Sequence, residues 1–362
     1  MDDLLTGARR VPVYLLTGFL GSGKTTLLNA LLAERVMPDT AIVVNEFGAV
    51  GIDQHLIRRV DEHVVLLRDG CLCCEVRTDL VQTMRELFVE HVTGVAQGGL
   101  ARVVIETSGL ADPVPIVHTM LADPALRERF VFAGTIATVD ATTDLAALCR
   151  RPEGVRQVTL ADRIVLTKGD LAGREAVHAL GERLRALNPD AVVEGSGSMQ
   201  ASALAARLGR GDPVGSPSGR RSGEHAGAAR PTYRAMHGVP VAACVLRAQA
   251  PLDWDAFVAW FGALLDPARP LLRVKGVLDV VGQPLPIVVQ AVQNVAYPAV
   301  TLAAWPDDDR RSRLVVIADN PRGLPRAALF DTLLPASAAW QRDDLPAAAA
   351  PDPLSPRPRA AA

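Results

Sequence analysis

Short apolar runs alternate with segments of helical periodicity along the first half of the chain. The runs are rich in β-branched residues and are bounded by turn-forming residues, which predicts buried strands. These strands are expected at residues 11–17, 41–45, 102–106, 130–139 and 163–167, with helices at 27–35, 79–90 and 174–187. Strands that alternate with helices form a parallel sheet covered on both faces. We therefore predict an α/β domain with a mostly parallel sheet flanked by helices.

The alternation stops near residue 209, where a stretch rich in Gly, Pro, Ser, Arg and Ala begins. Such a composition without periodicity is typical of a flexible linker. After it, a predicted helix at 253–265 and several successive predicted strands indicate a smaller α+β domain. The expected organisation is an α/β domain at 1–208, a linker at 209–232, an α+β domain at 233–335 and a disordered, Ala- and Pro-rich tail at 336–362.

A Walker A pattern follows the first predicted strand directly and precedes a predicted helix. Its glycines let backbone N–H groups turn toward the α- and β-phosphates of a nucleotide, and the helix N-terminus adds positive potential. Lys24 would reach the β- and γ-phosphates, and the Thr25 hydroxyl would bind Mg²⁺. We therefore predict a nucleoside triphosphatase whose phosphate site is formed by Gly18, Gly21, Ser22, Gly23, Lys24, Thr25 and Thr26.

A strand that ends in an acid lies where such a fold needs one. Glu106 ends the third predicted strand and is followed by Thr107, Ser108 and Gly109. A carboxylate there can hold Mg²⁺ through its water, and Gly109 can offer its N–H to the γ-phosphate. Lys24 and Glu106 are therefore predicted catalytic residues.

The end of a later predicted strand carries the residues expected to recognise the base. Asp170 could accept two hydrogen bonds from guanine, whose N1–H and N2–H₂ are adjacent donors, whereas adenine lacks that pair. The methylenes of Lys168 would lie along the base plane. With Thr167, these residues predict a preference for GTP over ATP.

Three of the five cysteines fall within four residues, as Cys71, Cys73 and Cys74. Three thiolates in one turn offer soft ligands to Zn²⁺, Co²⁺ or Cu(I). A redox role is less favoured, because the adjacent Cys73 and Cys74 would close a strained disulfide. The cluster lies between the phosphate loop and Glu106, a stretch that responds to the γ-phosphate in P-loop GTPases. We therefore expect metal affinity to depend on the bound nucleotide.

Composition limits the classes of partner. With 38 Lys and Arg against 40 Asp and Glu, the net charge is -2, which gives no electrostatic reason to expect nucleic acid or an anionic membrane. No apolar run reaches the roughly 20 residues that span a bilayer, and the first ten residues lack the apolar core of a secretory signal. A cytoplasmic location is expected.

Together these motifs resemble the CobW-type GTPases, a family of cytoplasmic metal chaperones and metal-insertion factors. The Glu106 box matches the family's Walker B element, and Thr167 departs from the family's usual Asn in the base-recognition motif. The resemblance extends into the second domain through Tyr297 and residues 272–276. Further matching segments are residues 18–26, 45–48, 51–53, 70–74 and 106–113, with Trp305 and Pro306.

The resemblance implies GTP and Mg²⁺ on the phosphate loop and Zn²⁺ or Co²⁺ on the cysteines, for delivery to a client metalloprotein or a cofactor-synthesis enzyme, as in cobalamin synthesis. Glu46 is expected to complete the transition-metal site, and Asp53 is a catalytic candidate in the Mg²⁺ shell or beside the attacking water. No residue is a clear general base, so catalysis would rest on positioning and charge neutralisation. Nucleotide-dependent dimers are common among related GTPases, which makes such a homodimer a candidate assembly.

Two other classes remain open from the sequence. A P-loop kinase would transfer phosphate to a small molecule, and a phosphorylated acceptor in place of free phosphate would identify it. A non-catalytic module could hold structural zinc on the cysteines, which would resist chelators until the protein unfolds. Lys168 and Asp170 argue against a kinase, and the lack of a plain fourth ligand argues against a closed structural zinc site.

Overall fold

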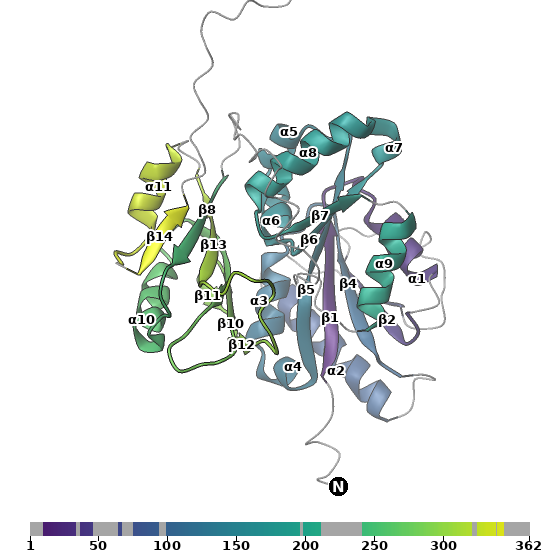
Figure 1. The fold of residues 1–362 in the computed structure, drawn as a ribbon. Helices are drawn as coiled ribbons and strands as arrows, with labels where there is room; N and C mark the ends of the chain where they lie inside the picture. Colours follow the sequence, from purple (N-terminus) through teal and green to yellow (C-terminus); the bar gives the residue numbers. More distant parts are fainter. Residues whose placement is uncertain are drawn as a thin grey trace, which may run out of the picture.

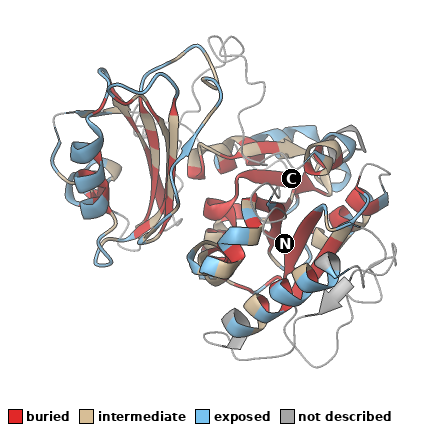
Figure 2. Ribbon diagram, turned by 90° about the horizontal axis from the view of Figure 1, so that it is seen from below, coloured by how far each residue is buried: buried red, intermediate tan, exposed pale blue. Residues whose placement is uncertain are grey.

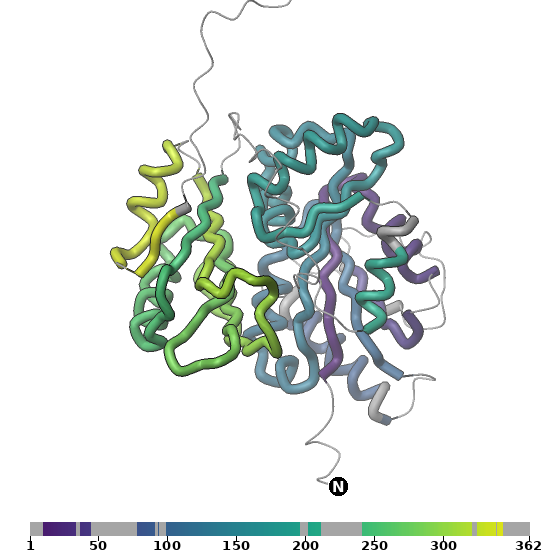
Figure 3. The backbone as a smooth tube through the Cα atoms, viewed as in Figure 1, coloured from purple at the N-terminus to yellow at the C-terminus, as the bar shows by residue number. Residues whose placement is uncertain are grey.

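The computed structural model describes residues 10–33, 37–45, 64–66, 75–93, 99–195, 198–210, 241–320, 324–337 and 339–343. These residues form two sheets with helices packed around them (Figure 1). The backbone trace in Figure 3 follows the chain from the first sheet, in purple and teal, to the second, in green and yellow.

The first sheet has seven strands in the order β3-β2-β4-β1-β5-β6-β7. All of its described strand pairs are parallel, which confirms the predicted α/β class. The strands are β1 (Val11–Gly18), β2 (Thr40–Asn45), β3 (Val64–Leu66), β4 (Arg102–Thr107), β5 (Phe130–Asp140), β6 (Arg163–Thr167) and β7 (Val192–Gly195). From β1 the chain first builds the strands on one side of it (β2, β3 and β4) and then those on the other side (β5, β6 and β7). In open α/β sheets, ligands bind at the carboxyl ends of the strands where the strand order changes direction in this way, which here is the end of β1.

Alternate residues of β1 pack on opposite faces of this sheet. Val13 and Leu15 share one cluster with helices α2 and α3, whereas Tyr14 and Leu16 share another with α1 and α9. The burial colours of Figure 2 show red strands between helices whose outer surfaces are pale blue. The helices are α1 (Lys24–Ala33), α2 (Glu75–Val92), α3 (Val114–Ala122), α4 (Pro124–Arg129), α5 (Leu145–Cys149), α6 (Pro152–Leu160), α7 (Gly169–Ala172), α8 (Arg174–Leu187) and α9 (Ser198–Gly209).

The second sheet is antiparallel in its described pairs and follows the order β11-β10-β9-β13-β8-β14, with β12 paired to β10. With α10 (Trp254–Leu264) and α11 (Arg326–Leu333) it forms the expected smaller α+β unit. Its strands are β8 (Val241–Ala248), β9 (Leu271–Leu278), β10 (Ile287–Val292), β11 (Val295–Ala296), β12 (Val300–Thr301), β13 (Arg313–Asp319) and β14 (Trp340–Asp343).

Residues 340–343, which the sequence predicted to belong to a disordered tail, form β14 along the edge of the second sheet. Trp340 packs against the cluster of the second sheet and lies 5.4 Å from the Trp260 ring, centroid to centroid. The sequence prediction was wrong here because one aromatic residue in an Ala- and Pro-rich stretch shows no strand periodicity. These residues become a strand through their hydrogen bonds to β8. Most of the predicted linker, residues 211–232, lies outside the described part of the chain.

Both faces of the second sheet are covered. Cys244 and Val316 pack against α10 and α11, while the neighbouring Ala243 and Ile317 pack against a cluster that includes Leu180 of α8. The first domain therefore covers the other face of the second sheet.

Candidate functional site

The phosphate loop connects β1 to α1 at the centre of the first sheet. Gly18 ends β1 with φ +143°, a value that L side chains rarely adopt. A Cβ atom at Gly18 would lie 2.4 Å from Thr138 Oγ1 and 2.5 Å from the Thr138 carbonyl oxygen. The close approach of β5 therefore requires glycine at the start of the loop.

Lys24 folds back across this loop. Its Nζ donates hydrogen bonds to the carbonyl oxygens of Gly18 at 3.0 Å and Phe19 at 3.3 Å. The ammonium group is therefore held within the loop at the N-terminus of α1, where the positive helix end and the backbone N–H groups favour an anion.

Thr25 and Glu106, predicted from distant parts of the sequence, are neighbours. Parallel pairing of β1 with β4 places Leu16 opposite Glu106 and brings the end of β4 beside the loop. Thr25 Oγ1 donates a hydrogen bond to Glu106 Oε1 at 2.9 Å, and Glu106 is buried. A hydroxyl and a carboxylate at this separation form a hard oxygen donor set, which fits Mg²⁺.

Buried hydroxyl groups form hydrogen bonds beside and with the phosphate loop. The side-chain oxygens of Ser22 and Thr138 are 2.6 Å apart, and Thr107 Oγ1 donates to Thr17 Oγ1 at 2.9 Å. Thr167 Oγ1 donates to the Ser22 carbonyl oxygen at 2.7 Å. The hydroxyl that stands in place of asparagine thus ties the end of β6 to the phosphate loop. Sequence reasoning missed the role of Thr17 and Thr138, because a threonine within a buried strand is ordinary there.

The residues expected to recognise the base lie at the ends of β5 and β6. Lys168 adopts a left-handed conformation with φ +53°, and its Nζ donates to Asp140 Oδ2 at 2.7 Å. Burial raises the pKa of Asp140, but hydrogen bonds from Lys168 and Thr142 outweigh it and lower the pKa overall. Asp170 is exposed in the first turn of α7. Asp140 was not singled out from the sequence, although it directly follows a predicted strand.

The loop after β4 packs directly on the phosphate loop. A Cβ atom at Gly109 would lie 2.7 Å from both the backbone nitrogen and the Cα of Leu20. Only glycine allows this approach, and it places Gly109 beside the loop where a γ-phosphate is expected. Gly21 and Gly23 complete the turn with positive φ, and Thr26 is exposed on the first turn of α1.

The predicted transition-metal site lies outside the described residues, as do Glu46, Asp53, Cys71, Cys73 and Cys74. Within the described part of the chain, no group of three or more His, Cys, Asp or Glu side chains could hold a metal ion. Cys149 and Cys244 are both buried. None of the described helices is long and apolar enough to cross a membrane.

Comparisons with known proteins agree with this geometry. Residues 12–194 match the family model described as CobW/HypB/UreG, nucleotide-binding domain, and residues 241–335 match the cobalamin synthesis protein cobW C-terminal domain. The chain is 33% identical over 314 residues to the zinc chaperone YjiA of Escherichia coli, which covers 85% of this chain and 93% of that protein.

A second relative is the zinc chaperone CobW of a Sinorhizobium species, 26% identical over 365 residues that cover 88% of this chain and 96% of that protein. Among solved structures, that of Zn(II)-bound YjiA GTPase from E. coli matches with a TM-score of 0.60 at 28% identity, over 91% of this chain and 100% of that chain.

Proposed function

Because the chain belongs to the CobW/HypB/UreG family of nucleotide-binding proteins, we propose that it is a GTP-hydrolysing metallochaperone. The observation that carries the proposal is the 2.9 Å contact of Thr25 Oγ1 with Glu106 Oε1 beside a complete phosphate loop. The Cys71, Cys73 and Cys74 cluster and the zinc-chaperone names of the relatives support a transition metal as the cargo.

At the nucleotide site, Thr25 and Glu106 would hold Mg²⁺, which when bound neutralises negative charge on the phosphates. Lys24 exchanges its bonds to the Gly18 and Phe19 carbonyls for bonds to the β- and γ-phosphates. Gly109 offers its N–H to the γ-phosphate, and Asp53 positions the attacking water. Since no described side chain is placed as a strong general base, hydrolysis depends on positioning and charge and is slow in the absence of a partner.

Guanine selectivity is assigned to Asp170. An Asp170→Asn variant is expected to bind GTP about tenfold to 100-fold more weakly, because the guanine N1–H and N2–H₂ donors lose a charged acceptor. The asparagine amide can donate to the 2-oxo group of xanthine, so affinity for xanthosine triphosphate should rise. Competition of GTP, xanthosine triphosphate and ATP against a fluorescent guanine nucleotide measures both changes.

Glu175→Gln on the adjacent helix α8 is the matched control, since it removes an exposed carboxylate outside the base site. It should leave the ranking of the three nucleotides unchanged. If D170N kept the GTP affinity of the wild type, the base would be recognised elsewhere.

The cargo site comprises Cys71, Cys73 and Cys74, with Glu46 as the fourth ligand for Zn²⁺ or Co²⁺. These residues lie between the phosphate loop and β4, in the stretch that follows the nucleotide state in related GTPases. Hydrolysis therefore resets the metal site and releases the ion to a client protein. Three thiols within four residues remain reduced in the cytoplasm, where we place this activity.

Domain roles follow from this assignment. Residues 1–208 bind nucleotide and metal, residues 209–232 link the domains, and residues 233–335 recognise the client. A nucleotide-dependent homodimer is the assembly we expect in the GTP state. The proposal includes no nucleic-acid or membrane partner, in accord with a net charge of -2.

Titration of the reduced protein with Zn²⁺ and Co²⁺, in GDP and in a non-hydrolysable GTP analogue, tests the function. We expect thiolate-to-Co²⁺ absorption, an affinity that differs between the two nucleotides, and loss of both in Cys73→Ser. Cys149→Ala, which removes a buried thiol of α5, should bind metal as the wild type does. Equal affinity in both nucleotides, or binding that survives C73S, would contradict a GTP-gated metal carrier.

A further inference from the structure

Helix α6 holds the loop that follows β4. The Gln157 side chain is 1% exposed, and its Nε2 donates hydrogen bonds to the carbonyl oxygens of Gly109 at 3.2 Å and Ala111 at 3.1 Å. One residue earlier on the helix, Arg156 forms an ion pair with Asp112. The loop is thus attached to α6 at Gly109, Ala111 and Asp112.

This attachment acts on the loop at its contact with the phosphate site. Gly109 lies between Gln157 on one side and the backbone of Leu20 on the other, where a Cβ atom would lie 2.7 Å from the Leu20 nitrogen. Because the loop has contacts on both sides, the position of α6 sets how far Gly109 lies from the phosphate loop.

The hydrogen-bonding capacity of the Gln157 side chain is only partly used. Its Oε1 is buried and has no hydrogen-bond partner among the described residues. A buried amide oxygen in that state destabilises a fold, so the favourable polar contacts of this side chain are the two that its Nε2 makes with the loop carbonyls. The amide therefore fits a role in holding the loop better than a role in core packing.

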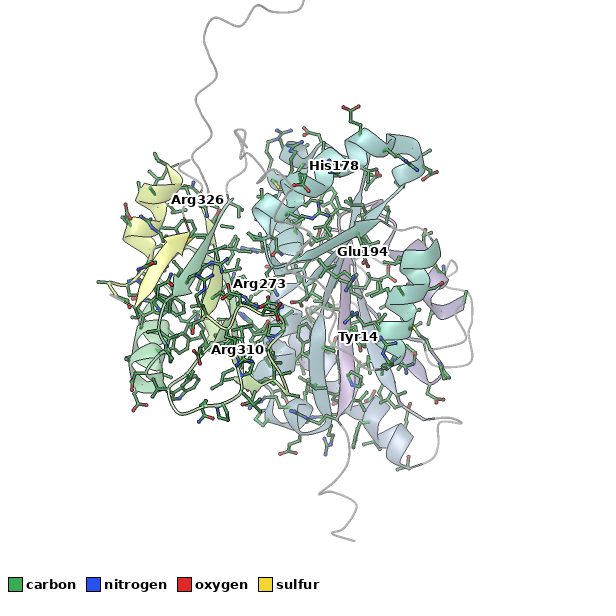
Figure 4. All side chains as sticks on the ribbon, viewed as in Figure 1. Tyr14, His178, Glu194, Arg273, Arg310 and Arg326 are labelled. Atoms are coloured by element: carbon green, nitrogen blue, oxygen red, sulfur yellow. The ribbon has the colours of Figure 1, made fainter. Side chains whose placement is uncertain are left out.

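The second domain caps the C-terminal end of α6, one turn beyond Gln157. Arg273, on β9, donates from Nη1 to the carbonyl oxygens of Leu160 and Ala161, each at 2.8 Å. Arg273 also pairs with Asp162, and Figure 4 places it where the second sheet meets the first domain. A cation at a helix C-terminus is favourable, and here it comes from a different domain.

We propose that Gln157 is a positioning residue for γ-phosphate recognition, and that Arg273 of the second domain fixes its position through α6. This inference rests on the proposed GTPase function. Arg273 binds the end of α6, Gln157 of that helix binds the loop, and Gly109 of the loop contacts the γ-phosphate. A client that displaces the second domain would consequently change the rate of GTP hydrolysis.

Gln157→Met tests the first contact, since it keeps the side-chain length and removes the donor. The kcat/KM for GTP should fall about tenfold, as expected for loss of one to two hydrogen bonds that position the loop. Affinity for GDP, which has no γ-phosphate, should stay within about twofold of the wild type. Thermal unfolding monitors the fold, and Glu153→Gln on the first turn of α6 is the control expected to change neither constant.

Arg273→Lys tests the second contact while keeping a charge beside Asp162. It should lower kcat/KM for GTP in the same direction, and its effect should be smaller in the Gln157→Met background, because two steps of one chain of contacts are not additive. If R273K does not fold, Lys275→Arg loosens the same cluster, since Lys275 Nζ lies 3.1 Å from Asp162 Oδ1.

The outcomes separate the inference from the function on which it rests. Wild-type protein that neither binds nor hydrolyses GTP would overturn the proposed function. Active wild-type protein with a Q157M variant of equal kcat/KM would overturn the inference alone. Additive effects of Q157M and R273K would overturn the part assigned to the second domain.

Discussion

Replacing Lys24 with methionine is expected to lower the kcat of GTP hydrolysis by about 100- to 1000-fold, the usual loss on removing one preorganised donor from a developing charge. The Lys24 ammonium group lies inside the phosphate loop, 3.0 Å from the Gly18 carbonyl oxygen. Methionine keeps the length of the side chain and removes its charge. Phosphate release under saturating GTP, with GTP affinity measured separately, gives the size of the effect.

Two further variants make the result specific. Lys24→Arg keeps a positive charge with a bulkier head group and should retain part of the rate. Glu175→Gln, an exposed carboxylate of α8 outside the phosphate site, should stay close to the wild type in kcat. A K24M enzyme within about threefold of the wild type would show that Lys24 does not stabilise the transition state.

Asp162→Ala is expected to lower the free energy of unfolding by about 3 kcal/mol, the lower end for breaking a buried ion pair. It removes one counter-charge of the buried Arg273 and Lys275 side chains, while Asp190 stays at 4.0 Å and 2.9 Å from them. Asp162 lies at the domain interface, 7% exposed, and pairs with Arg273 and with Lys275 at 3.1 Å. It also accepts a hydrogen bond from the Thr135 backbone nitrogen at 2.9 Å. Urea unfolding followed by tryptophan fluorescence reports on the second domain, which contains all four tryptophans, Trp254, Trp260, Trp305 and Trp340.

Asp331→Ala is the matched control for this prediction. Asp331 pairs with Arg342 at 2.8 Å, but the two side chains are 62% and 31% exposed. Ion pairs in contact with water contribute about 0–1 kcal/mol, so this variant should unfold close to the wild type. An equal loss in both variants would mean that burial of the Asp162 cluster does not decide its contribution.

The same cluster predicts a dependence of stability on pH. Burial raises the pKa of Asp162, but the charges of Arg273 and Lys275 outweigh it and lower the pKa from 3.8 to about 2. A carboxyl group whose pKa is lowered in the folded state stabilises the fold above its unfolded pKa. That contribution, about 2 kcal/mol, is therefore lost as the pH falls from about 4 to 2. The D162A variant should lack this component of the acid transition.

The residues proposed to bind phosphate could be found from the sequence because their spacing is local. Lys24 and Thr25 are fixed by a strand, a glycine-rich turn and a helix that follow one another without interruption. Glu106 could be found because it ends a buried strand, and the carboxyl ends of parallel strands meet at one edge of a sheet. The structure brings Thr25 and Glu106 to hydrogen-bond distance.

Gln157 and Arg273 could not be found in this way. Gln157 is 48 positions from Gly109, and Arg273 is 113 positions from Leu160. A glutamine within a helix and an arginine within a strand are ordinary residues with no spacing that indicates a site. Their proposed roles depend on α6, whose last turn packs beside the loop and is capped by a side chain from β9.

The sequence by itself determined the class of fold, the nucleotide chemistry and the candidate metal ligands, because each depends on short-range periodicity or on residues within one turn. Tertiary structure alone decided which polar side chains support the phosphate loop and how the second domain is attached to it. Those contacts form between segments whose relative placement is set by the burial of apolar faces, such as those of Ala243 and Ile317, and not by the polar residues themselves.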